Sequence, residues 1–144
     1  MTVSVQNSIF GIDEERLDDE PERPFWLDLP MDDEAVRVGP GILRIMSNAQ
    51  SHDAEVTLSL QQGAQKEVTP DYTFLGRWDF KTGSGTMFVH DLDGPLEEFS
   101  LPSDSVLEVR VWRKGGEDAA ERYNQSLGQE FPIHDLESYR IVFS

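Results

Sequence analysis

The sequence contains no cysteine among its 144 residues. This absence excludes a disulfide framework and a thiolate metal site, and it suits a reducing compartment in which packing alone supplies the stability. The sequence also lacks a basic N-terminal region followed by an apolar run, and no stretch approaches the roughly 20 apolar residues of a membrane span. We therefore expect a cytoplasmic protein.

Basic residues are scarce. Twelve lysines and arginines stand against 28 aspartates and glutamates, which gives a formal net charge of −16. A protein that binds nucleic acid needs a basic stripe to neutralise phosphates, and the sequence shows no such stripe. The negative field of this chain extends beyond its surface at low salt. We therefore expect a basic protein as partner and no direct contact with nucleic acid or a membrane.

The negative charge is concentrated in residues 13–34, which we name the acidic segment. Eleven acids and two arginines give it a net charge of −9, whereas seventeen acids and ten bases give the other 122 residues a net charge of −7. Its first half adds two prolines and little apolar content, which is typical of a loop or mobile arm. The bulky stretch from Phe25 to Leu29 is expected to hold the segment against the core. The predicted partner-binding residues are Asp13, Glu14, Glu15, Asp18, Asp19, Glu20, Glu22, Asp32, Asp33 and Glu34.

No catalytic motif is present. The chain has neither a cysteine nor a Gly-x-Ser-x-Gly elbow, and nothing in its sequence brings a serine against a particular histidine. The neighbouring acids Glu97-Glu98 and Asp32-Asp33 could supply an acid–base pair for glycoside hydrolysis, but adjacent residues of a strand point to opposite faces. We therefore expect a protein without catalytic residues that is not an enzyme.

Each of the three histidines, at positions 52, 90 and 134, is followed by an aspartate. Three such pairs gathered from loops could bind a divalent metal, but polar residues are common at strand ends and nothing in the sequence makes the pairs neighbours. The stretch Asp91-Leu92-Asp93-Gly94 looks like the start of a calcium loop, yet its twelfth position is Pro102, where a bidentate glutamate is required. We expect no metal and no cofactor.

The clearest periodic stretch spans residues 105–113. Apolar residues at 107, 109 and 111 alternate with charged residues at 108 and 110, so we interpret the stretch as a half-buried central strand. The preceding Pro102-Ser103-Asp104 predicts the turn of a β-hairpin or a β-arch.

Other β-rich stretches recur at roughly ten-residue spacing, with turn residues between them. They lie at 2–12, 36–46, 54–60, 68–80, 87–89 and 139–143. Gly83-Ser84-Gly85 is expected to form a hairpin loop, and residues 117–127 could form one short helix that Gly128 ends. We predict an all-β fold, a two-sheet antiparallel β-sandwich of about eight strands, as a single domain over 1–144.

The order of several of these expected strands and turns along the chain is informative. Gly41-Ile42 begins one strand, 56–60 forms another, Phe99-Ser100-Leu101-Pro102 leads into the strand that closes on Val111-Trp112, and a strand at Tyr139 ends the chain. This order resembles the competence protein J family over about two thirds of the chain. Ser103-Asp104-Ser105 departs from the lysine-glycine-aspartate of that family, and residues 114–136 look like an insertion. The resemblance implies a β-sandwich and a small cytoplasmic inhibitor of a DNA-entry nuclease, and it carries over no functional residue.

The leading expectation is an inhibitor or immunity protein that occludes a basic partner such as a nuclease or toxin. Enzymes that hold phosphates are basic, and carboxylates of the acidic segment could occupy the place of those phosphates. The alternative is a ligand-binding β-sandwich of the carbohydrate-binding-module kind, with Trp26, Trp78 or Trp112 as the platform. In a third interpretation, the acidity belongs to a salt-adapted proteome and carries no information about function.

Overall fold

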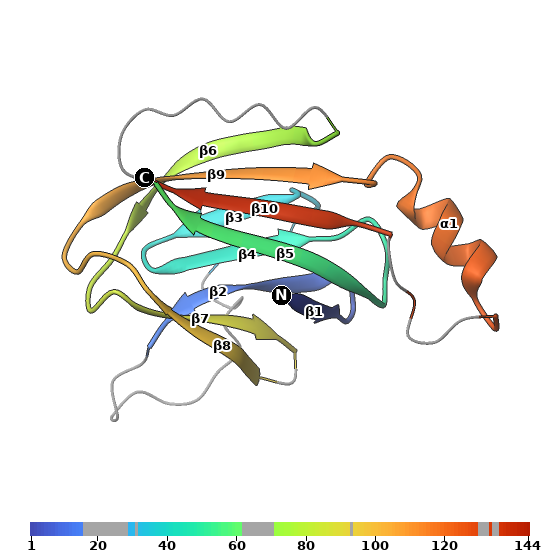
Figure 1. Cartoon of the computed structure of the whole chain (residues 1–144), viewed down its shortest axis with the longest axis horizontal. Coiled ribbons are helices and arrows are strands. Elements are labelled where there is room, and N and C mark those ends of the chain that lie inside the picture. Colours follow the sequence, from blue (N-terminus) through green and yellow to red (C-terminus); the bar gives the residue numbers. More distant parts are fainter. Residues whose placement is uncertain (16–28, 31, 62–70, 93, 130–132, 134–135) are drawn as a thin grey trace.

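The computed structural model describes residues 1–15, 29–30, 32–61, 71–92, 94–129, 133 and 136–144. Two five-stranded sheets pack against each other, and a short helix, α1 (Ala119–Ser126), lies beyond one end of the sandwich (Figure 1). Sheet A has the strand order β1 (Thr2–Val5), β5 (His52–Leu60), β10 (Ser138–Phe143), β9 (Val106–Lys114) and β6 (Thr73–Lys81). Sheet B has the order β3 (Val36–Gly39), β4 (Ile42–Met46), β2 (Ile9–Glu14), β7 (Thr86–Asp91) and β8 (Gly94–Ser100).

This architecture confirms the predicted all-β sandwich and its short helix. The described residues contain ten strands, more than the eight expected. The stretch 2–12, expected as one strand, forms β1 of sheet A and β2 of sheet B, and a turn at Gly41 divides 36–46 into β3 and β4. Gly41 has a φ of +69°, a conformation that glycine adopts without the penalty of a Cβ. Sheet A is mixed, because β10 pairs with β5 in parallel. A parallel pair needs a long crossover, and the chain between β5 and β10 supplies it.

The inward side chains of both sheets form the core. Val109 and Val111 of β9 are fully buried, as are Tyr139, Ile141 and Phe143 of β10, the central strand of sheet A. The alternation predicted for both strands is therefore confirmed. Each such side chain contributes roughly 1.5–3 kcal/mol to stability by its removal from water.

The turn after β8 is an arch, the second of the two forms that the sequence allowed. β8 belongs to sheet B and β9 to sheet A, so the chain crosses between the sheets there (Figure 1). Asp104 takes the left-handed conformation, with a φ of +48°, and the Thr82 hydroxyl accepts a 3.0 Å hydrogen bond from the Ser105 amide. The arch thus positions β9 by contacts with the end of β6.

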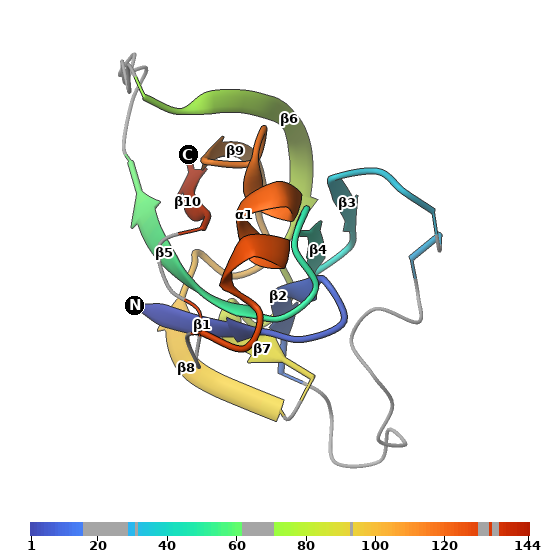
Figure 2. The ribbon, with the colours of Figure 1, turned by 90° about the vertical axis from the view of Figure 1, so that its right-hand side faces the viewer.

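The edges of the sandwich differ. Along one edge β3 of sheet B lies beside β6 of sheet A, so the two sheets converge there (Figure 2). The opposite edge strands are β8 and β1. Over the described part of the chain, no helix is long and apolar enough to cross a bilayer.

Candidate partner-binding site

Both described ends of the acidic segment lie on sheet B. The segment leaves β2 at Asp13 and Glu14 and re-enters the sheet at β3. Phe10 and Ile12 of β2 are core residues, so Asp13 points to the outer face of the sheet. There its Oδ1 atom lies 2.6 Å from Nε2 of His90 in the neighbouring strand β7. The predicted acidic residue Asp13 is therefore held in place by a histidine from the adjacent strand.

A pocket of about 300 Å³ opens at this point. Its lining residues are Asp13, Glu14, Glu15, Phe88, His90 and Pro95. The Phe88 and His90 rings lie edge to face, with centroids 6.2 Å apart. A pocket lined by carboxylates and an aromatic ring suits a lysine or arginine side chain, which both kinds of group attract.

Glu14 also binds the loop between β6 and β7. Its Oε1 atom accepts hydrogen bonds from the amides of Gly83 at 2.6 Å and Gly85 at 3.0 Å. Gly85 has a φ of +82°, and a Cβ at that position would lie 2.2 Å from the Leu101 carbonyl oxygen. The hairpin loop predicted at Gly83-Ser84-Gly85 is wrong, because β6 belongs to sheet A and β7 to sheet B, so this loop connects the two sheets. Glu14 ties the loop to the acidic segment.

The far end of the acidic segment is anchored on the outer face of sheet B. Leu29 is buried against Ile9 and Ile42, which confirms for this residue the expected hold on the core, while Phe25 to Asp28 lie outside the described residues. Arg44 is fully buried and donates a 2.7 Å hydrogen bond to the Pro30 carbonyl.

Asp32 completes the contacts that hold this end of the acidic segment. Its carboxylate pairs with Arg37 and lies 3.3 Å from Nη2 of the buried Arg44. The hydrogen bond from Arg37 is the main cause that lowers the pKa of Asp32 from 3.8 to about 2. Asp32 therefore serves mainly to fix the segment, and its charge is already shared with two arginines.

The remaining predicted residues fall into two groups. Glu15, Asp33 and Glu34 are exposed at the two described ends of the segment and are the carboxylates most open to a partner. Asp18, Asp19, Glu20 and Glu22 lie outside the described residues, so their contribution stays a prediction.

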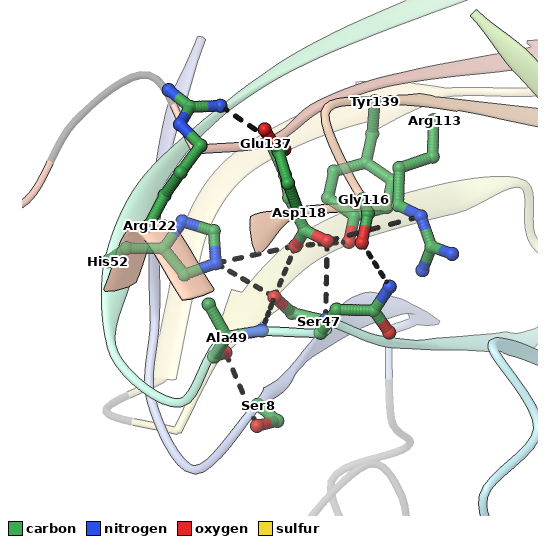
Figure 3. Close-up of polar contacts among 11 residues, drawn as sticks. Ser8, Ser47, Ala49, His52, Arg113, Gly116, Asp118, Arg122, Glu137 and Tyr139 are labelled. Atoms are coloured by element: carbon green, nitrogen blue, oxygen red, sulfur yellow. Dashed lines mark hydrogen bonds and ion pairs between the residues drawn. The ribbon is translucent and has the colours of Figure 1, made fainter. Parts of the chain in front are cut away.

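A polar cluster that the sequence did not suggest is buried at the end of the sandwich near α1 (Figure 3). The Glu137 carboxylate accepts hydrogen bonds from the Ser47 hydroxyl, from the Tyr139 hydroxyl at 2.8 Å and from the Asn48 amide at 3.2 Å. Burial alone would raise the pKa of Glu137, but these bonds and one from His52 outweigh it and lower the pKa. Burial is also the main cause that raises the pKa of Tyr139 well above its ordinary value.

Ser47, His52 and Glu137 have the residue types of a hydrolase triad but not its geometry. Nε2 of His52 lies 2.8 Å from Ser47 Oγ and 3.4 Å from Glu137 Oε1, whereas Nδ1 has no hydrogen-bond partner among the described residues. In a triad the carboxylate binds Nδ1 and the serine proton goes to Nε2. Here the serine donates to the carboxylate and is 5% exposed, so the cluster stabilises the fold and cannot attack a substrate. One signal of it existed in the sequence, because Glu137 has the same strand parity as the buried Tyr139 and Ile141.

The His-Asp pairs and tryptophans that the structure describes are not gathered into one site. His52 begins β5 in sheet A, His90 is in β7 of sheet B, and His134 lies outside the described residues. Within the described ranges, no group of three or more His, Asp or Glu side chains could hold a metal ion. Trp78 packs against the core, whereas Trp112 lies on the outer face of sheet A, so these two do not form one platform. Trp26 lies outside the described residues.

No protein-family model and no curated protein sequence matches the chain. Among solved structures, the chain is similar to ComJ, inhibitor of the DNA degrading activity of NucA, from Bacillus subtilis, with a TM-score of 0.61 and 13% sequence identity. The similarity covers 99% of this chain and 92% of ComJ. A protein named crocagin biosynthetic gene J is also similar, with a TM-score of 0.47, 11% identity and coverage of 99% and 93% of the two chains. The similarity to ComJ shows a shared fold, in agreement with the resemblance seen in the sequence.

Proposed function

We propose that this protein is an inhibitor that binds a basic enzyme acting on nucleic acid and covers the surface that holds the phosphates. The single observation that carries this proposal is the shared fold with ComJ, an inhibitor of a DNA-degrading activity, over almost the whole chain. The net charge of −16 supports it, because an enzyme that holds phosphates presents lysines and arginines.

The contact surface in this proposal is the outer face of sheet B with the acidic segment. Glu15, Asp33 and Glu34 are exposed there, and the pocket beside Asp13 and Phe88 would take one basic side chain of the partner. Arg44 and Asp32 hold the far end of the segment in place in the free protein. Less conformational entropy is therefore lost when the segment binds a partner.

The inhibition would be steric and electrostatic. Exposed carboxylates at the rim of an interface mainly raise the association rate, and each is worth about 0–1 kcal/mol. The rate of dissociation depends more on buried contacts, for which the pocket beside Phe88 is the candidate.

The experiment uses the protein encoded by the gene next to that of this chain, provided that it degrades nucleic acid. DNA degradation is measured with and without this protein, and association kinetics are measured at two salt concentrations. The segment variant carries Glu15→Gln, Asp33→Asn and Glu34→Gln. The control variant removes three exposed acids near α1 and carries Asp71→Asn, Glu117→Gln and Glu121→Gln.

We expect inhibition by the wild type, and slower association with a weaker salt dependence for the segment variant. The control variant has the same net charge and should associate almost as fast as the wild type. Equal association rates for the two variants would place any inhibitory surface elsewhere on the sandwich. A neighbouring gene for a glycoside hydrolase, together with no effect on nucleic-acid degradation, would contradict the proposal and favour a carbohydrate-binding module.

A further inference from the structure

The basic side chains are unevenly distributed over the molecule. Of the twelve lysines and arginines, Arg16, Arg23 and Lys66 lie outside the described residues, which leaves nine. Five of these nine are paired with acids: Arg37 and Arg44 with Asp32, Arg110 with Glu108, Arg113 with Glu137 and Arg122 with Asp118. Apart from Arg113, the basic residues of the adjacent strands β6, β9 and β10 are Arg77, Lys81, Arg110, Lys114 and Arg140.

All five point away from the core. In β9, Arg110 and Lys114 alternate with the buried Val109 and Val111. The same alternation turns the basic residues of β6 and β10 outward, because Arg77 is paired in register with Arg110, and Arg140 stands between two buried residues. We name this outer surface of β6, β9 and β10 the arginine face.

The charge of the arginine face is opposite to that of the whole protein. Two acids, Asp79 and Glu108, point outward from the same three strands, so the face carries five bases against two acids, a net of +3. Arg77 lies directly opposite Arg110 across the two strands, an arrangement of like charges that is unfavourable by itself. Glu108 lies 3.6 Å from Arg110 and offsets part of this repulsion, whereas Arg77, Lys81 and Lys114 make no hydrogen bond or ion pair within the described residues. A surface with these three bases suits a negatively charged partner.

Aromatic side chains lie at the same place. Phe74 is 51% exposed, and its ring centroid lies 5.2 Å from that of Trp112. The guanidinium of Arg110 lies 5.5 Å from the Trp112 ring centroid. Arginine and large aromatic residues are the types that contribute most to protein–protein interfaces. The arginine face therefore has the composition of an interface.

We propose that the arginine face binds the acidic segment of a second copy of this chain. The two surfaces are complementary in charge, with a net of +3 on the face and −9 on residues 13–34. The described ends of the acidic segment lie on sheet B, on the other side of the sandwich from the arginine face (Figure 2). The contact therefore joins two copies head to tail, in an arrangement that further copies can extend.

Salt affects this contact in two ways. The repulsion between two chains of −16 acts over a long range and is screened beyond about 8 Å at physiological ionic strength, while the local contacts persist. Association should therefore be strongest at intermediate salt and should fall at high salt.

Because the acidic segment is also the contact surface of the proposed function, a bound second copy would compete with the basic partner. Only this consequence rests on the proposed function.

The experiment measures molar mass against concentration by sedimentation, with no partner enzyme present, so that its outcome is independent of the proposed function. The face variant carries Arg77→Gln, Lys81→Gln and Lys114→Gln. The segment variant of this experiment differs from the one described above and carries Asp18→Asn, Asp19→Asn, Glu20→Gln and Glu22→Gln. The control variant, which has the same net charge as the face variant, adds three acids near α1 as Asn124→Asp, Gln125→Glu and Gln129→Glu. Circular dichroism and thermal unfolding confirm that each variant is folded.

We expect the mass of the wild type and of the control variant to rise with concentration, while the face variant and the segment variant each remain monomeric. An equimolar mixture of these two should form a dimer that grows no further, because each supplies one intact half of the contact. A monomeric wild type at every concentration and salt would overturn the proposal. So would a face variant that associates like the control, or a mixture that stays monomeric.

Discussion

The two outer faces of the sandwich handle charge in opposite ways. On sheet B, the buried Arg44 is bound by Asp32 and by a backbone carbonyl, and exposed carboxylates surround this anchor. On sheet A, Arg77 and Arg110 face each other across adjacent strands. The difference shows that the net charge of −16 does not describe any particular surface of this protein.

The comparison also separates two uses of arginine. The guanidinium of Arg44 is removed from water, so its hydrogen bonds are needed to offset the cost of burial. Arg77 is exposed and is free to meet a partner's carboxylate. The first arginine stabilises the fold, and the second is the one that we propose for recognition.

The assignment of an inner and an outer face depends on the alternation of inward and outward side chains in β9. The largest expected effect tests this alternation. Val109→Asp places a charge without a partner in the core and should cost roughly 5 kcal/mol, comparable to the stability of a whole domain. Arg110→Asp, one residue away on the outer face, should remain folded. Urea unfolding followed by circular dichroism measures both. A cooperatively folding Val109→Asp variant would remove the basis for assigning the two faces.

A smaller effect compares the two arginines directly. Arg44→Ala leaves the Pro30 carbonyl without its donor and opens a void under the segment, so we expect a loss of about 2–3 kcal/mol. Arg77→Ala should change the stability by no more than about 0.5 kcal/mol, since the side chain is exposed. The urea unfolding midpoints of the two variants measure both losses of stability. Equal losses would show that Arg44 and Arg77 do not differ in their contribution to the fold.

The smallest effect is a pH dependence. The pKa of Asp32 is lowered from 3.8 to about 2, so its pairing contributes stability that is complete above about pH 4 and is lost as the pH falls through about 2. Glu137, whose pKa is also lowered, acts in the same direction. Asp32→Asn should therefore flatten, without abolishing, the fall of stability between pH 4 and pH 2. Arg37→Gln should do the same because it removes the main cause of the shift, and unchanged slopes in denaturant titrations would contradict both expectations.

Much of the fold could be predicted from local patterns. The alternation in β9 and β10 and the short helix each depend on residues that are close together in the sequence. The turn at Gly83-Ser84-Gly85 was also placed correctly, but whether it forms a hairpin or crosses between the sheets depends on strand pairing. The number of strands was underestimated because two β-rich stretches are each divided by residues with positive φ, 36–46 at Gly41 and 2–12 at Asn7 and Ser8. The parallel pairing of β5 and β10 was not predicted, since strand order is not contained in any local period.

The candidate site could be predicted only in part. The concentration of acids in residues 13–34 is a property of the sequence, but the pairing of Asp13 with His90 depends on the register of β2 against β7. The arginine face was invisible in the sequence because its members are dispersed over β6, β9 and β10. A basic stripe was sought along the chain, whereas the five bases come together across it.

The sequence by itself determined the β class, the charge and the inward residues of β9 and β10, because a period of two and a composition are local properties. Only the tertiary structure decided that Ser47 meets Glu137, ninety residues away along the chain, and that Arg77 lies opposite Arg110. The physical reason is that contacts between strands are set by sheet order and register, which the packing of the whole core selects. A shift of one residue in any strand would exchange its inward and outward side chains, so the chemistry of each face is fixed only when all ten strands are in place.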